Sequence, residues 1–118
     1  MSYIDGYIVP VPTANKQAYR EMATKAAEVF KENGAVRVVE SWGDDVPKGK
    51  VTDFQGAVKA ESNETIVFSW IEWPSKQARD AGMKRAMEDP RMQMSGNTVF
   101  DGKRMIFGGF ESLIDTRR

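Results

Sequence analysis

The longest apolar stretch with strand character runs from Thr65 to Trp73. It is dense in β-branched and aromatic residues, and Pro74 follows it directly. Because successive side chains of a strand point to opposite faces, both faces of this run are apolar: Ile66, Phe68 and Trp70 on one, Val67, Ile71 and Trp73 on the other. A strand with two apolar faces must be covered on both sides, so we predict that it lies in the centre of a sheet.

Three further runs of strand character predict three more strands. They span residues 3–9, 35–42 and 103–113. Pro10 and Pro12 are expected to end the first of these strands, because proline has no N–H to donate to a neighbouring strand. A short edge strand is also expected at residues 57–60, after Gly56.

Two segments repeat apolar residues at three- and four-residue spacing, which predicts two helices. The first spans residues 14–33 and ends at Gly34, because glycine adopts the left-handed conformation without steric cost. The second spans residues 75–89, with Ser75 capping its first turn and Pro90 ending it. The order along the chain is therefore strand, helix, strand, strand, helix, strand.

This order is the βαββαβ arrangement of the ferredoxin-like fold, an α+β sandwich in which an antiparallel sheet carries two helices on one face. We expect residues 1–118 to form one such domain, since this length supports a single core. Two helices cover only one face of the sheet, so the second apolar face needs another partner. The expected partner is a second copy, in a homodimer whose uncovered faces close into a dimeric α/β-barrel. The charged tail, residues 115–118, is expected to be poorly ordered unless it reaches that partner.

Composition narrows the possible functions. The chain carries 17 basic and 17 acidic residues, evenly spread, which argues against a nucleic-acid groove or a membrane-binding patch. It has no cysteine and no histidine, which removes thiolate catalysis, Ser-His-Asp triads and the common zinc sites, so we expect neither a metal nor a cofactor. No apolar run is long enough for a bilayer, and Asp5 interrupts any signal-peptide core. The prediction is a soluble, cytoplasmic protein.

Polar residues within the predicted strands are the main candidates for chemistry. They are Asp5, Arg37, Glu40, Ser69, Glu72, Arg104 and Glu111. One interpretation is that they form structural ion pairs across the sheet, as polar groups in small sheets commonly do. The other is that they line a cavity, because a buried charge needs a partner or a ligand. If they line a cavity, four methionines could form an adaptable wall for it: Met83, Met87, Met92 and Met94.

Several stretches resemble the small bacterial YbaA-like proteins of unknown function. They are residues 3–7 (YIDGY), 44–47 (DDVP), 49–52 (GKVT), 68–71 (FSWI), 100–106 (FDGKRMI) and 108–110 (GGF). The resemblance covers nearly the whole chain, although Thr98-Val99 stands where the family pattern has Met-Pro. It implies a dimeric α/β-barrel of ferredoxin-like protomers and supplies no catalytic residues. It draws attention to Asp101, Lys103 and Arg104 as a group.

The candidate ligand pocket combines this group with residues of the strands. Its members are Asp5, Tyr7, Ser69, Trp70, Asp101, Lys103 and Arg104. The first functional hypothesis is a homodimer that binds a small molecule between sheet and helices without chemistry. The alternative is a cofactor-free small-molecule enzyme, oxygenase-like or isomerase-like, with a carboxylate as base and Lys103 or Arg104 holding an anionic substrate. Both hypotheses have the same partners, a second copy of the chain and a small molecule.

Overall fold

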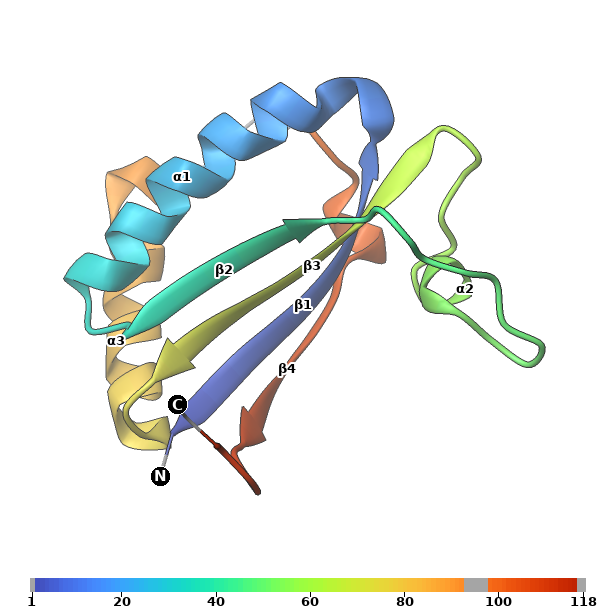
Figure 1. The fold of residues 1–118 in the computed structure, drawn as a ribbon. Helices are drawn as coiled ribbons and strands as arrows, with labels where there is room; N and C mark the ends of the chain where they lie inside the picture. The colour runs from blue at the N-terminus through green and yellow to red at the C-terminus, as the bar shows by residue number, and fades with distance from the viewer. Residues whose placement is uncertain (1, 93–97, 117–118) are drawn as a thin grey trace.

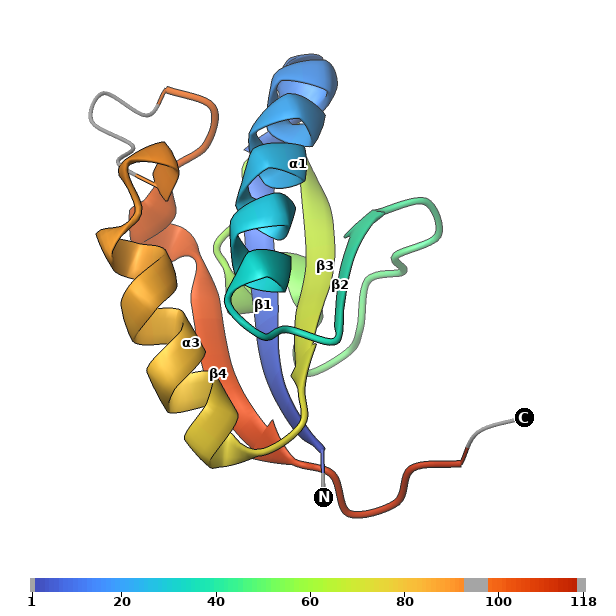
Figure 2. The same ribbon diagram turned by 90° about the vertical axis from the view of Figure 1, so that its left-hand side faces the viewer.

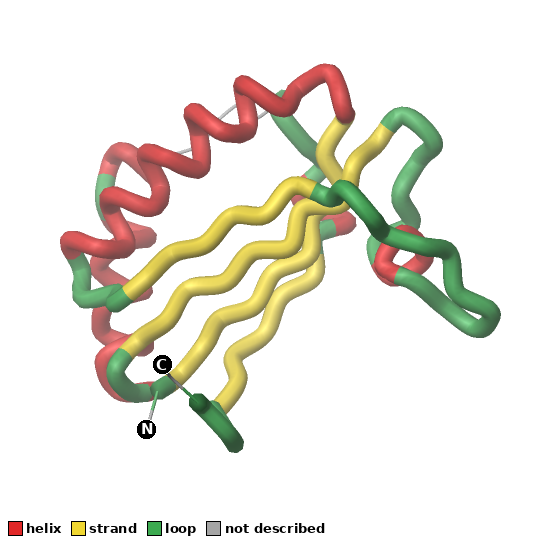
Figure 3. The backbone as a smooth tube through the Cα atoms, viewed as in Figure 1, coloured by secondary structure: helices red, strands yellow, loops and turns green. Residues whose placement is uncertain are grey.

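The computed structural model describes residues 2–92 and 98–116. Its centre is a four-stranded sheet whose strands are β1 (Tyr3–Pro12), β2 (Arg37–Trp42), β3 (Glu64–Trp73) and β4 (Ile106–Glu111). The strand order is β2-β3-β1-β4, and every neighbouring pair is antiparallel. Figure 3 shows the four strands side by side. The run from Thr65 to Trp73 lies in β3, one of the two central strands, as predicted.

Two helices, α1 (Lys16–Glu32) and α3 (Lys76–Glu88), cover the same face of the sheet (Figures 1 and 2). The predicted ferredoxin-like fold is therefore confirmed. Gly34 follows α1 at φ 107°, the left-handed conformation that was expected there. Ser75 Oγ accepts a hydrogen bond from Ala78 N at 3.1 Å, which makes Ser75 the predicted N-cap of α3. Neither helix, nor any other in the described ranges, is long and apolar enough to cross a membrane.

The core lies between the sheet and these helices. Val11, Val29, Val67 and Trp73 are fully or almost fully buried there, so the face of β3 with Val67, Ile71 and Trp73 is the one that the helices cover. Gly82 explains how closely α3 approaches: a Cβ at this position would collide with the Asn33 carbonyl oxygen and the Trp73 ring. The close approach brings the side chains of α3 over the middle of the sheet.

Three predicted boundaries were wrong because they depend on contacts outside the local sequence. Strand β1 continues through Pro10 to Pro12, and its pairing with β4 stops at Ile8. Beyond Ile8 it is an edge strand, where a missing N–H is tolerated. The last strand begins only at Ile106, because a 3-10 turn over Gly102–Arg104 precedes it. Strand β2 likewise begins two residues later than predicted, at Arg37.

The expected edge strand at residues 57–60 is also wrong. A single helical turn, α2 (Phe54–Ala57), takes its place in the connection between β2 and β3. Asp53 Oδ1 accepts a hydrogen bond from Gly56 N at 2.6 Å and so caps this turn, while Lys59 has a φ of 49°, which is incompatible with a strand. Phe54 packs edge to face on Phe68, with 6.0 Å between ring centroids. The turn therefore lies against the sheet face that α1 and α3 leave uncovered.

Candidate ligand-binding cavity

A cavity of about 420 Å³ lies between the sheet and the two helices. Four polar strand residues form its floor: Asp5, Tyr7, Glu40 and Ser69. Five methionines form much of its wall: Met22, Met83, Met87, Met92 and Met105. Three of the methionines predicted for such a wall are among them, and the fourth, Met94, lies outside the described residues. A long flexible thioether adapts to differently shaped ligands, so this lining is suited to a small organic molecule.

One row of side chains crosses the whole sheet on the cavity side. Glu40 of β2 is paired in register with Ser69 of β3, Ser69 with Tyr7 of β1, and Tyr7 with Phe107 of β4. Because paired residues of neighbouring strands point to the same face, these four side chains lie next to one another across the floor. The row runs from a carboxylate through two hydroxyls to an aromatic ring, so one end is polar and the other apolar.

Glu40 provides the carboxylate of this row. Its Oε1 accepts a hydrogen bond from the Tyr19 hydroxyl of α1 at 2.7 Å. The protein atoms around the carboxylate raise the pKa of Glu40, and the hydroxyls of Tyr19 and Ser69 partly offset that rise. Burial also raises the pKa of Tyr19 far above its usual range, with the charge of Glu40 adding to the effect. A carboxylate has about four acceptor positions, so Glu40 keeps acceptor capacity for a ligand.

Glu40 is an exposed residue, because it also lines a second hollow that is open to solvent. A groove of about 730 Å³ runs between α1 and the free edge of β2, and Tyr19, Ala23 and Glu40 line both the groove and the cavity. The groove is the larger of the two. It shares only one strand carboxylate with the cavity and lacks the row of paired polar residues, so the cavity is the better candidate site.

Tyr7 stands in the middle of the floor. Its ring stacks on Phe107, with centroids 6.1 Å apart and an angle of 27° between the planes. Burial raises the pKa of Tyr7 to about 12, with the negative charges of Asp5 and Glu40 adding to the rise and Arg79 opposing it. The phenol is therefore protonated at neutral pH. Within the described part of the chain its hydroxyl has no hydrogen-bond partner, and so it is available to a ligand.

Asp5 is only 4% exposed, and both of its carboxylate oxygens are occupied. Trp73 Nε1 donates to Oδ2 at 3.0 Å, and Arg79 Nη1 donates to Oδ1 at 2.8 Å. Arg79 also donates to the Tyr3 hydroxyl at 3.1 Å and lies over the Tyr3 ring at 4.7 Å. Burial raises the pKa of Asp5, while Arg79 and the Trp73 hydrogen bond lower it. This arrangement fixes α3 to the sheet and makes Asp5 a poorer proton acceptor than Glu40.

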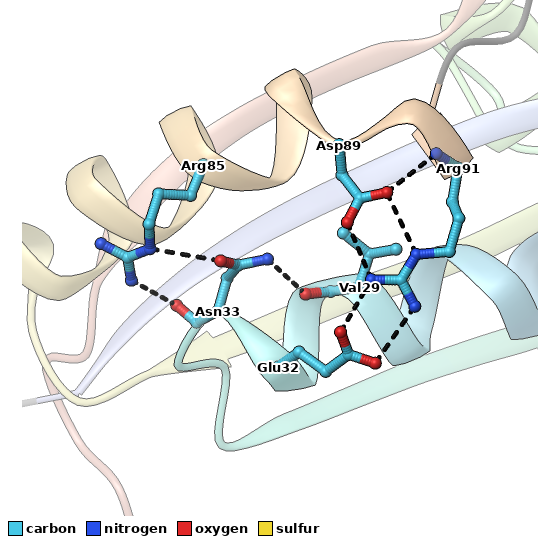
Figure 4. A network of polar contacts seen from close by, with 6 residues as sticks. All are labelled: Val29, Glu32, Asn33, Arg85, Asp89 and Arg91. Carbon is cyan, nitrogen blue, oxygen red and sulfur yellow. Dashed lines mark hydrogen bonds and ion pairs between the residues drawn. The ribbon is translucent and has the colours of Figure 1, made fainter.

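The second arginine of the cavity wall, Arg91, belongs to a polar network that joins the ends of α1 and α3 (Figure 4). Its guanidinium donates to both oxygens of Glu32, at 2.7 and 3.1 Å, and to both oxygens of Asp89, at 2.8 and 3.0 Å. Arg91 in turn lowers the pKa of Asp89 to about 2. Beside it, Arg85 donates to the side chain and the carbonyl of Asn33, at 3.2 and 3.1 Å. The network holds the helix layer in place and neutralises Arg91.

Residues 2–102 match the model of a family of proteins of unknown function, DUF1428. The chain therefore belongs to the DUF1428 family. It is 64% identical over 116 residues to the uncharacterised protein YbaA of Escherichia coli, a match that covers 98% of this chain and 99% of YbaA. The same identity is found with YbaA of Shigella flexneri. The predicted resemblance to YbaA-like proteins is thus confirmed.

Two solved structures share the fold of this DUF1428 protein at low sequence identity. One is a mutant of SnoaB, a cofactor-independent oxygenase from Streptomyces nogalater, with a TM-score of 0.61, 12% identity, and coverage of 99% of this chain and 98% of SnoaB. The other is a dimeric ferredoxin-like protein from an uncultured marine organism, with a TM-score of 0.59, 9% identity, and coverage of 98% of this chain and 100% of that protein. At these identities the two structures show the common fold alone.

The structure brings together three of the residues predicted for the pocket, Asp5, Tyr7 and Ser69. Trp70 points to the opposite face of the sheet, where its Nε1 donates to Glu72 Oε2 at 2.9 Å. This placement follows from strand alternation, since Trp70 is the neighbour of Ser69. The same open face holds an ion pair of 3.6 Å between Arg37 and Glu72.

The group of Asp101, Lys103 and Arg104 does not line the cavity either. Asp101 Oδ1 accepts from Lys103 N at 3.0 Å and caps the turn ahead of β4. Arg104 donates to both oxygens of Glu64, at 2.7 and 2.6 Å, and to Asp101 Oδ2 at 3.0 Å. The seven polar residues therefore divide only in part: Arg37, Glu72 and Arg104 form ion pairs outside the cavity, and Glu40 and Ser69 line the cavity. Asp5 lines the cavity and also pairs with Arg79, and Glu111 is exposed at the end of β4.

Sequence reasoning predicted Met83 and Met87 of α3 for the cavity wall but missed other contributions from the helices. Tyr19, Arg79 and Arg91 were not predicted to lie there. A signal for Arg79 was present, because Arg79, Met83 and Met87 follow one another at four-residue spacing and so share a face of α3. Glu40 was named among the polar strand residues but was not assigned to the pocket.

The substitution Glu40→Gln is expected to stabilise the protein at neutral pH. Because the pKa of Glu40 is raised in the folded state, the folded protein binds more protons than the unfolded one between the unfolded pKa, about 4.3, and the folded pKa. Wild-type stability therefore falls as pH rises through this window, and glutamine removes that loss while still accepting from Tyr19. Melting temperatures of both proteins, measured across the window, should diverge as pH rises.

The control for this prediction is Glu88→Gln, at an exposed position near the end of α3. Its melting temperature should differ from that of the wild type by only a small amount. If Glu40→Gln were instead less stable than the wild type at every pH, the carboxylate would be contributing to the fold, and our reading of its pKa would be wrong.

Proposed function

We propose that this protein binds a small organic molecule in the cavity between its sheet and its helices, as a homodimer of single-domain protomers. The observation that carries the proposal is the paired row of Glu40, Ser69 and Tyr7 on the floor of an apolar cavity. Known ligand pockets have volumes of about 300–1,000 Å³ with a few well-placed polar groups, and the cavity of about 420 Å³ falls within that range. Tyr7 and Glu40 supply the polar groups with hydrogen-bonding capacity to spare.

A thermal-shift screen with small metabolites tests this function. A molecule that binds only the folded state raises the melting temperature by an amount that grows with its concentration. Hits found with the wild type should give smaller shifts with Tyr7→Phe and with Glu40→Gln, and unchanged shifts with Glu88→Gln. Hits whose shifts are the same in all four proteins bind elsewhere and would count against the cavity.

The raised pKa of Glu40 supports the second function, a cofactor-free enzyme in which this carboxylate takes a proton from the bound molecule. Tyr7, protonated at neutral pH, would donate a hydrogen bond to the oxygen on which negative charge develops. A bound molecule with an acidic C–H distinguishes catalysis from binding. In deuterated water the wild type would exchange that hydrogen for deuterium, as seen by proton NMR, and Glu40→Gln would not, whereas a simple binding protein leaves the C–H intact.

The uncovered sheet face supports the homodimer. It carries Phe68, Ile106 and Phe110, which are 45%, 42% and 60% exposed. Such apolar exposure on one face of a small protein is typical of an interface. The dimeric ferredoxin-like protein from the marine organism shows that this fold supports dimers in at least one case.

The segment after β4 also supports the homodimer. Leu113 and Ile114 are 92% and 83% exposed, and Figure 2 shows this segment running away from the helices on the side of the uncovered face. The segment is anchored, because Ser112 N donates to Ser2 O at 3.2 Å and Ser2 Oγ donates to Asp115 Oδ2 at 3.2 Å. Two fixed apolar side chains in solvent are consistent with a contact to a second copy. The last residues of the predicted disordered tail, 117 and 118, lie outside the described residues.

A further inference from the structure

We propose that the cavity selects a neutral molecule that joins an apolar ring to a hydroxyl group, and that it rejects carboxylates and other anions. The inference rests on the proposed binding function and specifies the chemical class of its ligand. It is carried by the arrangement of charges in the wall and by the order of the row on the floor.

Both positive charges of the wall are already neutralised. Arg79 pairs with Asp5 at 2.8 Å and with Asp80 at 2.9 Å, and Arg91 pairs with two carboxylates of the helix ends. Among the described residues no other lysine or arginine lines the cavity. An anionic ligand would lose its hydration without gaining a free cation, and an unpaired charge in such a site weakens binding.

The floor adds a further obstacle to anions. Glu40 places a carboxylate at one end of the row, where the hydroxyls of Tyr19 and Ser69 lie beside it. A second negative charge beside it would be repelled in a site where nearby groups already favour the neutral state. The raised pKa values of Tyr7 and Glu40 have the same physical origin, since the cavity surroundings resist negative charge.

The order of the row suits a hydroxylated ring. A ligand hydroxyl at the carboxylate end of the row can donate a hydrogen bond to Glu40, and a ligand oxygen on the other side of Ser69 can accept one from the hydroxyl of Tyr7. Strands lie about 4.8 Å apart, so Glu40 and Tyr7 flank a space about two strands wide. The ring then lies toward Phe107 and the methionines, which offer aromatic and sulfur contacts.

The test uses three probes with the same bicyclic ring, each substituted at the same position: naphthol, methoxynaphthalene and naphthoic acid. Naphthol is neutral at neutral pH and donates a hydrogen bond, methoxynaphthalene is neutral and cannot donate, and naphthoic acid is ionised. Isothermal titration calorimetry with the wild type should give the tightest binding for naphthol. We expect methoxynaphthalene to bind about tenfold more weakly, as one lost hydrogen bond of about 1.4 kcal/mol implies, and naphthoate at least tenfold more weakly.

Substitutions then show which residues cause the preference for naphthol. Glu40→Gln removes the negative charge and should reduce the preference for naphthol over naphthoate, mainly by letting naphthoate bind better. Tyr7→Phe removes the donor to the ligand oxygen, which naphthol and methoxynaphthalene both carry, and should therefore weaken the binding of both probes. Glu88→Gln, which lies outside the cavity lining, should reproduce the wild-type affinities for all three probes.

Two results would overturn the inference. If naphthoate binds as tightly as naphthol to the wild type, or more tightly, the cavity accepts anions and the proposed class is wrong, while the binding function stands. If naphthol does not bind at all, hydroxylated rings are not the ligand class. The binding function itself fails separately, when the metabolite screen yields no hit that Tyr7→Phe or Glu40→Gln weakens.

Discussion

Replacing Phe68 with aspartate is expected to convert the proposed homodimer into a monomer or an aggregate. Phe68 lies in the central strand β3 on the face that α1 and α3 leave open. Its ring packs edge to face between Phe54 and Trp70, with centroid distances of 6.0 and 5.8 Å. A carboxylate placed there in a dimer would lie between two apolar faces, among the aromatic rings of Phe54 and Trp70. Burying an unpaired charge costs several kcal/mol, more than a small interface can offset.

Light scattering at micromolar concentration measures the result directly. The wild type should have twice the mass of one chain and Phe68→Asp the mass of one chain, unless the exposed face aggregates. Val36→Asp is the matched control, because Val36 is 49% exposed, close to the 45% of Phe68, and precedes β2 near the end of α1. It should remain dimeric. A wild-type protein that has the mass of one chain and keeps it on dilution would remove the basis for the dimer.

The placement of Phe68 on the face that the helices leave open shows how far strand alternation can predict a structure. The sequence placed Phe68 and Ile71 on opposite faces of one strand without deciding which face the helices cover. In the structure Ile71 is buried beneath the helices and Phe68 is exposed. Alternation fixes the relative orientation of neighbours, whereas the choice of face depends on which side the connecting helices cross, and that is a property of the whole chain.

Strand alternation also predicts one part of the candidate site, whereas the other part depends on strand register. Asp5, Tyr7 and Ser69 share the helix-facing side, and alternation alone could have excluded Trp70, which is adjacent to Ser69. The row from Glu40 to Tyr7 depends on the register of two strand pairs. Register is set by long connections such as residues 43–63, whose geometry has no simple sequence signal. The sequence therefore indicated polar residues within strands but not which of them meet.

Pairing partners were equally hard to predict. The enzyme hypothesis assigned Arg104 or Lys103 to hold an anionic substrate, yet Glu64, forty residues before Arg104 in the chain, accepts two hydrogen bonds from Arg104. Arg79 was not singled out, although it neutralises the most buried carboxylate of the cavity. An ion pair between distant residues depends on the fold that brings them together, so charge patterns along a single helix or strand do not reveal it.

Arg79→Ala is expected to be one of the most destabilising substitutions in the cavity wall. It leaves the carboxylate of Asp5 buried with only the Trp73 indole N–H as a donor. Removing one partner of a buried ion pair typically costs about 3–5 kcal/mol, and we expect the lower part of this range because the Arg79 side chain is partly exposed. Chemical denaturation at neutral pH measures the loss. The control is Asp80→Asn, which removes the exposed partner of the same arginine and should cost no more than about 1 kcal/mol.

The dependence on pH and on Asp5 itself identifies the cause of that loss. Arg79 lowers the pKa of Asp5, so without Arg79 that pKa rises further above its unfolded value. The penalty for the buried carboxylate is then greatest at neutral pH and disappears as pH falls and Asp5 becomes protonated. For the same reason Asp5→Asn should recover part of the stability in the Arg79→Ala background, although it removes an acceptor from the wild type. A loss that is independent of pH and is not reduced by Asp5→Asn would mean that Arg79 acts through its packing on Tyr3 and not through its charge.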